Sequence, residues 1–123
     1  MSTLKFIFAL LLAILPLKAG ADVFLLMAEE DGCLWCEKWD EEIAHIYPKT
    51  TEGQTAPLVR YDMHDGTPTQ FTLNSAPRFS PTFILINNGL EVGRIEGYPG
   101  EDFFWPLLLE LFNRAEITLE TTG

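Results

Sequence analysis

The sequence predicts an α/β domain built on a mixed four-stranded sheet, with helices on both faces. Short apolar runs, each long enough for a buried strand, are separated by a long helical pattern and by polar turns. Asn88 and Gly89 stand between two of these runs, and an Asn-Gly pair in that position is typical of a β-hairpin. The order strand, helix, strand, short helix, strand, strand, helix joins a parallel βαβ half to an antiparallel hairpin.

The first 21 residues are predicted to be a secretory signal peptide and not part of the domain. Lys5 supplies a positive start, residues 6–17 form an apolar run, and Ala19 and Ala21 provide small residues for cleavage. The apolar run is short for a membrane span. An uncleaved N-terminal anchor and a buried core helix are the alternatives, and cleavage after Ala19 or after Ala21 is left open.

The rest of the chain is long enough for one compact domain. Residues 22–114 are expected to form it, and residues 115–123 are expected to form a flexible tail. Without Lys5 and Lys18, six basic residues stand against eighteen acidic ones, a net charge of −12. So acidic a surface disfavours nucleic acid and anionic membranes as partners.

The first half of the domain contains one strand and one long helix. Residues 22–27 form an apolar run that predicts a buried strand, and residues 28–32 predict the loop that leaves it. A helix is predicted from Leu34 or Trp35 to Tyr47, because one face of that stretch is apolar and Pro48 ends it. The residues of this stripe are Trp35, Trp39, Ile43 and Ile46.

The middle of the chain alternates between loops and short elements. Residues 49–56 are polar and predict a loop, and residues 57–61 predict a second strand. Residues 62–68 are rich in turn formers, and residues 69–73 are predicted to hold a short helix. Residues 82–86 are the clearest buried strand of the chain.

The end of the domain is predicted to be a hairpin strand and a helix. In residues 90–96 the alternation of apolar and polar residues fails at Gly93, which a bulge would explain. A helix is predicted over residues 101–114. Because Pro106 is awkward inside it, either the regular helix starts near Trp105 or the helix kinks. The apolar side of this helix carries Phe104, Leu107, Leu108, Leu111 and Phe112.

The first predicted strand meets the first helix at the motif Cys33-Leu34-Trp35-Cys36. A disulfide across so short a loop stabilises much less than a bridge between distant segments, so the spacing indicates reactivity. Cys33 falls at or before the N-cap, where helix N–H groups favour the thiolate that attacks disulfides. Cys36 falls in the first turn, where it can resolve a mixed disulfide on Cys33. The motif therefore predicts a redox-active pair.

Two other roles are open for the cysteines. One is a purely structural disulfide. The other is a metal site, which would need two further ligands from His45 and His64, and their spacing matches no common zinc pattern. We therefore expect no metal, and no cofactor other than the disulfide itself.

The CxxC motif, the Asn-Gly hairpin, the last amphipathic helix and Ser80-Pro81-Thr82 at the start of an apolar strand together resemble the thioredoxin family. The resemblance covers residues 22–114 and implies a thioredoxin-like fold. It further implies that the proline opening the third core strand is cis and faces the reactive cysteine, and Pro81 matches that proline. A trans proline that begins a strand is the alternative. Ser80 and Pro81 would offer backbone groups to a partner chain.

The chain departs from the thioredoxin pattern next to the cysteines and beneath them. Gly32 precedes the motif, and Leu34 and Trp35 lie inside it, so the family's W-C-G-P-C signature is absent. The buried aspartate that assists proton transfer in the family would fall at Met27, which cannot titrate. Cys36 must then lose its proton to water or to another group, for which Glu29 and Glu30 are the candidates.

Acidic residues surround the motif and bear on the direction of the reaction. They suit the start of a helix but disfavour a thiolate at Cys33. Strong oxidants hold their thiolate unusually stable, often beside positive groups, and Leu34 and Trp35 supply none. We therefore expect a disulfide reductase. Trp35 and Leu34 are predicted to form an apolar rim beside Cys33, although Trp35 also fits the core stripe. The acids are Glu29, Glu30, Asp31 and Glu37.

A narrower resemblance is to the periplasmic SoxS-type thioredoxins of bacterial sulfur oxidation. It rests on the short exported form, the run G-C-L-W-C-E-K-W-D-E-E-I and the stretch Y-P-x-T-x-E-G. It implies a periplasmic thiol-disulfide oxidoreductase that reduces a blocked cysteine on a sulfur-carrier protein and is itself reduced by a membrane thiol electron carrier. The alternatives are a reductant of apocytochrome c cysteines and a non-catalytic binding module that keeps a fixed disulfide.

Overall fold

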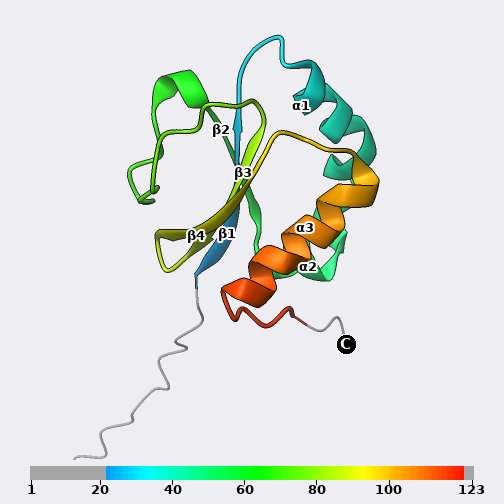
Figure 1. Cartoon of the computed structure of the whole chain (residues 1–123), viewed down its shortest axis with the longest axis vertical. Helices are drawn as coiled ribbons and strands as arrows, with labels where there is room; N and C mark the ends of the chain where they lie inside the picture. The colour runs from blue at the N-terminus through cyan, green and yellow to red at the C-terminus, as the bar shows by residue number, and fades with distance from the viewer. Residues whose placement is uncertain (1–21, 121–123) are drawn as a thin grey trace, which may run out of the picture.

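The computed structural model describes residues 22–120, and the predicted signal peptide lies outside them. A four-stranded sheet in the order β2-β1-β3-β4 forms its centre (Figure 1). β1 and β2 are parallel, and β3 is antiparallel to both β1 and β4. The predicted mixed sheet is therefore confirmed. The strands are β1 (Val23–Glu29), β2 (Leu58–Asp62), β3 (Thr82–Asn87) and β4 (Leu90–Glu96).

The two central strands, β1 and β3, are buried on both faces. Their side chains point alternately to opposite sides and contribute to two separate apolar clusters. This double burial explains why both strands appear in the sequence as continuous apolar runs. One cluster contains Leu25, Met27, Phe83 and Leu85 from these strands, and the other contains Leu26, Ile84 and Ile86.

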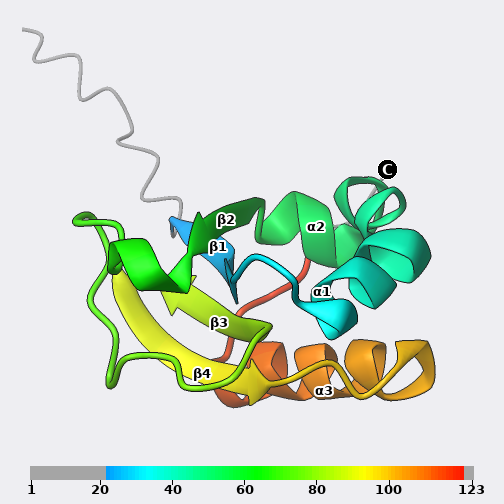
Figure 2. The same ribbon diagram turned by 90° about the horizontal axis from the view of Figure 1, so that it is seen from above.

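Figure 2 shows α1 (Leu34–Trp39), α2 (Thr51–Thr55) and α3 (Glu101–Arg114) on one side of the sheet. α1 continues into a π-helical segment, η1 (Asp40–Ala44), and a 3-10 turn, η2 (Tyr47–Lys49), follows. The single helix predicted up to Tyr47 therefore changes its hydrogen-bonding pattern after Trp39. Trp39 and Ile43 of the predicted stripe are fully buried.

α2 lies inside the stretch of residues 49–56, where the prediction of a loop was wrong. Thr50 caps this helix, because its Oγ1 accepts from the N–H of Gly53 at 3.0 Å. A Cβ at residue 53 would overlap the carbonyl group of Tyr47, so the close approach requires glycine. A five-residue helix held by a cap and one close contact has no apolar stripe for the sequence to display.

α3 has the predicted bounds. The buried side chains on its inner side are Phe104, Leu108, Leu111 and Phe112. The helix begins at Glu101, so of the two alternatives given for Pro106 the structure excludes a regular helix that starts near Trp105. Pro106 is exposed, so water can reach the carbonyl group that its missing N–H leaves without a helical partner.

The β3–β4 hairpin turns through Asn88 and Gly89, which both have positive φ, as the two-residue turn requires. Leu85 faces Gly93 but Ile86 faces Glu91, so one extra residue forms the predicted bulge. A Cβ at Gly93 would lie 2.7 Å from Leu111 Cδ2. The missing side chain therefore lets α3 pack closely on the bulge.

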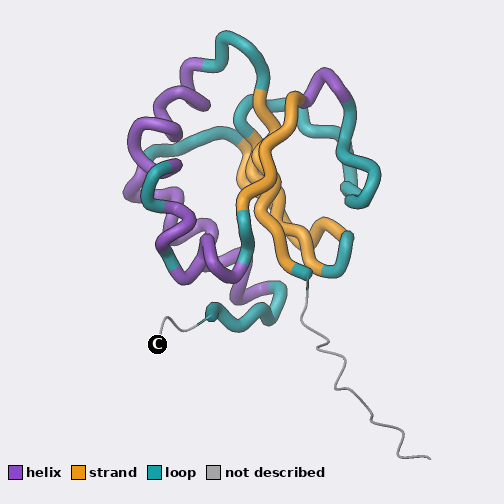
Figure 3. The backbone as a smooth tube through the Cα atoms, turned by 180° about the vertical axis from the view of Figure 1, so that it is seen from behind, coloured by secondary structure: helices purple, strands orange, loops and turns teal. Residues whose placement is uncertain are grey.

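A long segment between β2 and β3 covers the opposite face of the sheet, and Figure 3 shows it mostly as loop. Its helical part is the 3-10 turn η3 (Met63–Asp65). The short helix predicted for residues 69–73 was wrong. Phe71 instead packs on Phe24 with 5.6 Å between ring centroids, and Thr72 pairs with Leu90 in an isolated bridge.

Residues 115–120 lie against the domain and do not project from it. Ile117 and Leu119 pack on the core, and the N–H of Glu120 donates to Thr55 Oγ1 at 2.7 Å. The remaining residues of the expected tail, 121–123, lie outside the described part. Between residues 22 and 120, no helix is long and apolar enough to cross a membrane.

Candidate active site

The two cysteines lie where β1 meets α1. After β1 the chain turns through Gly32, whose φ of +72° is a left-handed conformation that glycine adopts readily. Cys33 is the N-cap of α1, and Cys36 lies in the first turn. The two residues form a disulfide, and their Cα atoms are 5.2 Å apart. The motif is thus placed at the strand–helix junction.

The two sulfurs differ in exposure and in hydrogen bonding. Cys33 is partly exposed, whereas Cys36 is 4% exposed. The N–H of Cys36 donates to Cys33 Sγ at 3.1 Å. Such a donor stabilises negative charge on the Cys33 sulfur when the disulfide is reduced. The more exposed sulfur is therefore the one equipped to attack a partner.

The loop before β3 lies against the disulfide. The Ser80–Pro81 peptide bond is cis, and Ser80 Oγ is 3.2 Å from Cys36 Sγ. Thr82 Oγ1 donates to the carbonyl oxygen of Phe79 at 2.6 Å, and the N–H of Gly97 donates to the carbonyl oxygen of Pro81 at 2.7 Å. These bonds fix the loop and hold the Ser80 hydroxyl at the buried sulfur.

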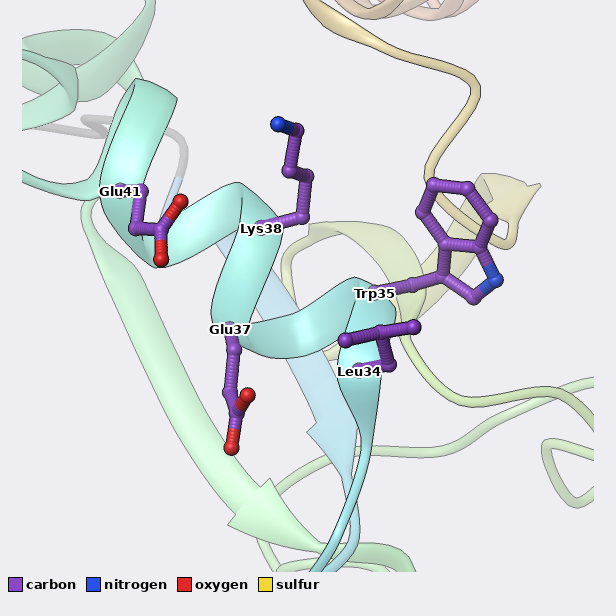
Figure 4. Close-up of a pocket in the computed structure, with 5 residues that line it drawn as sticks. All are labelled: Leu34, Trp35, Glu37, Lys38 and Glu41. Carbon is purple, nitrogen blue, oxygen red and sulfur yellow. The ribbon is translucent and has the colours of Figure 1, made fainter.

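Exposed apolar side chains flank the site. Leu34 is 69% exposed, Trp35 54% and Phe79 55%. A pocket beside α1 is lined by Leu34, Trp35, Glu37, Lys38 and Glu41. Figure 4 shows that the Trp35 side chain points away from those of Glu37 and Glu41. Trp35 therefore belongs to the surface and not to the core stripe. Phe79 was not predicted from the sequence, where its position directly before Ser80-Pro81 was the one indication of such a role.

The carboxylates expected to accept the proton of Cys36 are engaged elsewhere. Glu29 Oε1 accepts from Arg60 Nη2 at 2.9 Å, and Glu30 Oε2 lies 2.7 Å from His64 Nε2. Met27, at the place of the family's aspartate, is fully buried. Among residues 22–120, the side-chain oxygen that contacts Cys36 Sγ is the hydroxyl of Ser80.

Arg60 was also missed from the sequence, because its partners lie 20 and 31 residues away. It stands opposite Met27 in the β1–β2 register. Its Nη1 donates to Asp40 at 2.7 Å, and its guanidinium lies 5.9 Å from the ring centroid of Trp39. Hydrogen bonds to Glu29 and then to Asp40 raise the pKa of Arg60 above its ordinary value. Arg60 is thus a fixed cation whose charge two carboxylates balance.

The histidines do not join the cysteines. His45 is exposed in the turn after η1, and His64 contacts Glu30. Over the described range 22–120, no three His, Cys, Asp or Glu side chains gather in a group that could hold a metal ion.

A CxxC disulfide at the start of the first helix, beside a proline that opens a central strand, defines a thiol-disulfide oxidoreductase of thioredoxin-like fold. Solved structures similar to this chain are also thioredoxins. The crystal structure of the periplasmic thioredoxin SoxS from Paracoccus pantotrophus, in its reduced form, is 50% identical with a TM-score of 0.74. The match covers 76% of this chain and 98% of that one. The chain therefore belongs to the thioredoxin-like family.

A second solved structure, thioredoxin f2 of Chlamydomonas reinhardtii, is 15% identical and has a TM-score of 0.52. The match covers 80% of this chain and 82% of that one, and it supports the fold alone. No family model and no curated protein sequence matches the chain.

Proposed function

We propose that the protein is a periplasmic thiol-disulfide reductase that acts on a disulfide or a blocked cysteine of a partner protein. The observation that carries this proposal is the difference between the two sulfurs. Cys33 is partly exposed and accepts a backbone hydrogen bond, whereas Cys36 is buried behind it. Such a pair suits an attacking thiolate and a resolving thiol.

The proposed reaction has two steps. The Cys33 thiolate attacks the partner's disulfide and forms a mixed disulfide, and the released partner sulfur takes up a proton. Cys36 then loses its proton and attacks the Cys33 sulfur. This step forms the Cys33–Cys36 disulfide and releases the second partner sulfur. The partner gains two electrons, and the dithiol loses two.

The surroundings of Cys33 support the reducing direction. Glu37 lies in the first turn of α1, and nearby carboxylates disfavour a thiolate at Cys33. Leu34 and Trp35 bring no positive charge, and the charge of Arg60 is balanced by Glu29 and Asp40. A strongly oxidising protein would need the opposite, a thiolate held unusually stable.

The similarity to the periplasmic thioredoxin SoxS supports the location in this proposal. The client is proposed from the resemblance of the run around Cys33 and Cys36, and of the Y-P-x-T-x-E-G stretch, to the SoxS-type thioredoxins. Residues 1–21 act as an export signal, and the client is a sulfur-carrier protein of bacterial sulfur oxidation. A membrane thiol electron carrier returns the disulfide to the dithiol. Leu34, Trp35 and Phe79 give the client an apolar surface beside Cys33.

Two cysteine variants test the proposal. Cys33→Ser should abolish disulfide reduction, whereas Cys36→Ser should accumulate a covalent complex with the client, because the mixed disulfide is not resolved. Complexes trapped in the native periplasm are separated without reductant and identified by mass spectrometry. Ser75→Ala, an exposed change away from the sulfurs, is the control.

Three results would contradict this proposal. Full reductase activity of Cys33→Ser would exclude the mechanism. Trapping of apocytochrome c in place of a sulfur carrier would exclude the client. A disulfide that resists mild dithiol at thioredoxin-like potentials would indicate a non-catalytic binding module.

A further inference from the structure

Resolution of the mixed disulfide requires a proton to leave Cys36. In the part of the chain that the structure describes, no carboxylate is hydrogen-bonded to this sulfur. Cys36 is 4% exposed, and Met27 lies in the same apolar cluster. A buried thiolate is costly unless a hydrogen bond stabilises it. Glu29 binds Arg60 instead, and Glu30 binds His64.

The Ser80 hydroxyl is in the right place to supply that hydrogen bond. Ser80 Oγ is 3.2 Å from Cys36 Sγ, within reach of a sulfur hydrogen bond. A hydroxyl can donate to a thiolate and can accept from a thiol, so the contact suits both protonation states. The loop bonds of Thr82 and Gly97 hold Ser80 at the sulfur.

We propose that the Ser80 hydroxyl donates a hydrogen bond to Cys36 as its thiolate forms, and so sets the rate at which the mixed disulfide is resolved. This role rests on the proposed function, because it needs a mixed disulfide on Cys33. In the step, the Cys36 proton leaves to water. The Cys36 thiolate then forms a bond to the Cys33 sulfur, and the bond from Cys33 to the partner breaks. The leaving sulfur takes the electron pair and then a proton.

The test separates attack from resolution in a single turnover. Reduced wild-type protein is mixed in excess with an aromatic disulfide whose thiolate product absorbs visible light, such as Ellman's reagent. The first thiolate is released when Cys33 attacks, and the second when Cys36 resolves the mixed disulfide. The two rate constants are measured by stopped flow at several pH values.

Ser80→Ala should slow the second release by about tenfold, the size expected for one hydrogen bond to a charged group. The first release should change by no more than about twofold. The pH midpoint of the second release should rise, because the thiolate loses its donor. Ser80→Thr keeps a hydroxyl and should restore the rate and the midpoint, and Ser75→Ala should leave both rates unchanged.

Equal slowing of both releases in Ser80→Ala would overturn the inference, because it would indicate a disturbed loop. An unchanged second release, or a failure of Ser80→Thr to restore it, would overturn it as well. These results leave the proposed function intact. If the wild-type protein releases no thiolate at all, the proposed function itself fails.

Discussion

His64 and Glu30 form a hydrogen-bonded pair close to the turn that leads to Cys33, with 2.7 Å between Nε2 and Oε2. The hydrogen bond to Glu30 raises the pKa of His64 above its ordinary value of 6.5. Folding therefore favours the protonated imidazole. The stabilisation by this pair is fully present below the unfolded-state pKa and is lost as the pH rises through the folded-state pKa.

Glu30→Gln should lower the pKa of His64, because it removes the charged acceptor. The pKa is measured by NMR titration of the imidazole protons. Glu37→Gln, which removes a carboxylate from α1, is the matched control and should leave the pKa of His64 near the wild-type value. An unchanged pKa of His64 in Glu30→Gln would mean that the pair does not form in solution.

The residues that the sequence placed well are those whose role depends on local spacing. Cys33 and Cys36 lie at the strand–helix junction because the motif and the neighbouring elements adjoin in the chain. Glu29 and Glu30 were assigned as proton acceptors by proximity in sequence, and the fold directs them to partners more than 30 residues away. The contact of Ser80 with Cys36 spans 44 positions, so no local pattern could reveal it.

Among the elements, α2 depends on one glycine. A Cβ at residue 53 would overlap the carbonyl group of Tyr47, which is backbone and cannot turn aside as a side chain can. Gly53→Ala should therefore lower the free energy of unfolding by about 2–3 kcal/mol, in the range of overpacked sites. Urea unfolding of the oxidised protein measures this change.

Gln54→Ala is the matched control for that prediction, because Gln54 is exposed in the same short helix. It should change the free energy of unfolding by no more than about 0.5 kcal/mol. Equal stabilities of Gly53→Ala and Gln54→Ala would show that the turn from η2 into α2 is wider in solution than the structure has it.

Hydrophobic patterning predicted the elements that bury apolar side chains. The four strands and α3 lie close to the predicted positions, because burial requires apolar residues at a regular period. The pattern did not predict the segments whose conformation depends on capping, on a close backbone contact or on the packing of single side chains. Thr50 and Gly53 define α2 by a cap and a close contact. In residues 69–73, packing of Phe71 on Phe24 and pairing of Thr72 with Leu90 replace the predicted helix.

At the scale of the whole molecule, the order of elements was enough to predict the mixed sheet, because a helical crossover and a tight hairpin allow few arrangements. It could not show how each face is covered. Helices α1, α2 and α3 lie on one side, and a mostly irregular segment lies on the other (Figure 2). The irregular segment covers the apolar cluster on that face with a few side chains, among them Phe71 and Leu73. These residues do not recur at the period of a helix, so the sequence pattern did not reveal them.

The acidic charge of the domain should affect its reaction with charged disulfides. The part of the chain described by the structure carries a net charge of −12, and carboxylates flank the motif. Opposite charges attract over about 10 Å at moderate salt, and this range shrinks as salt is added. A cationic disulfide should therefore meet Cys33 more often than an anionic one.

The reduced protein should react with cystamine at a rate that falls several-fold between about 20 mM and about 500 mM salt. With oxidised glutathione, which is anionic, the rate should rise over the same range. Comparing each disulfide with itself removes the difference in their intrinsic reactivities. Glu37→Gln should flatten both dependences slightly, because it removes one charge from the first turn of α1. If both rates changed in the same direction with salt, charge on the protein would not be steering the encounter, and a client with a basic surface would gain no advantage.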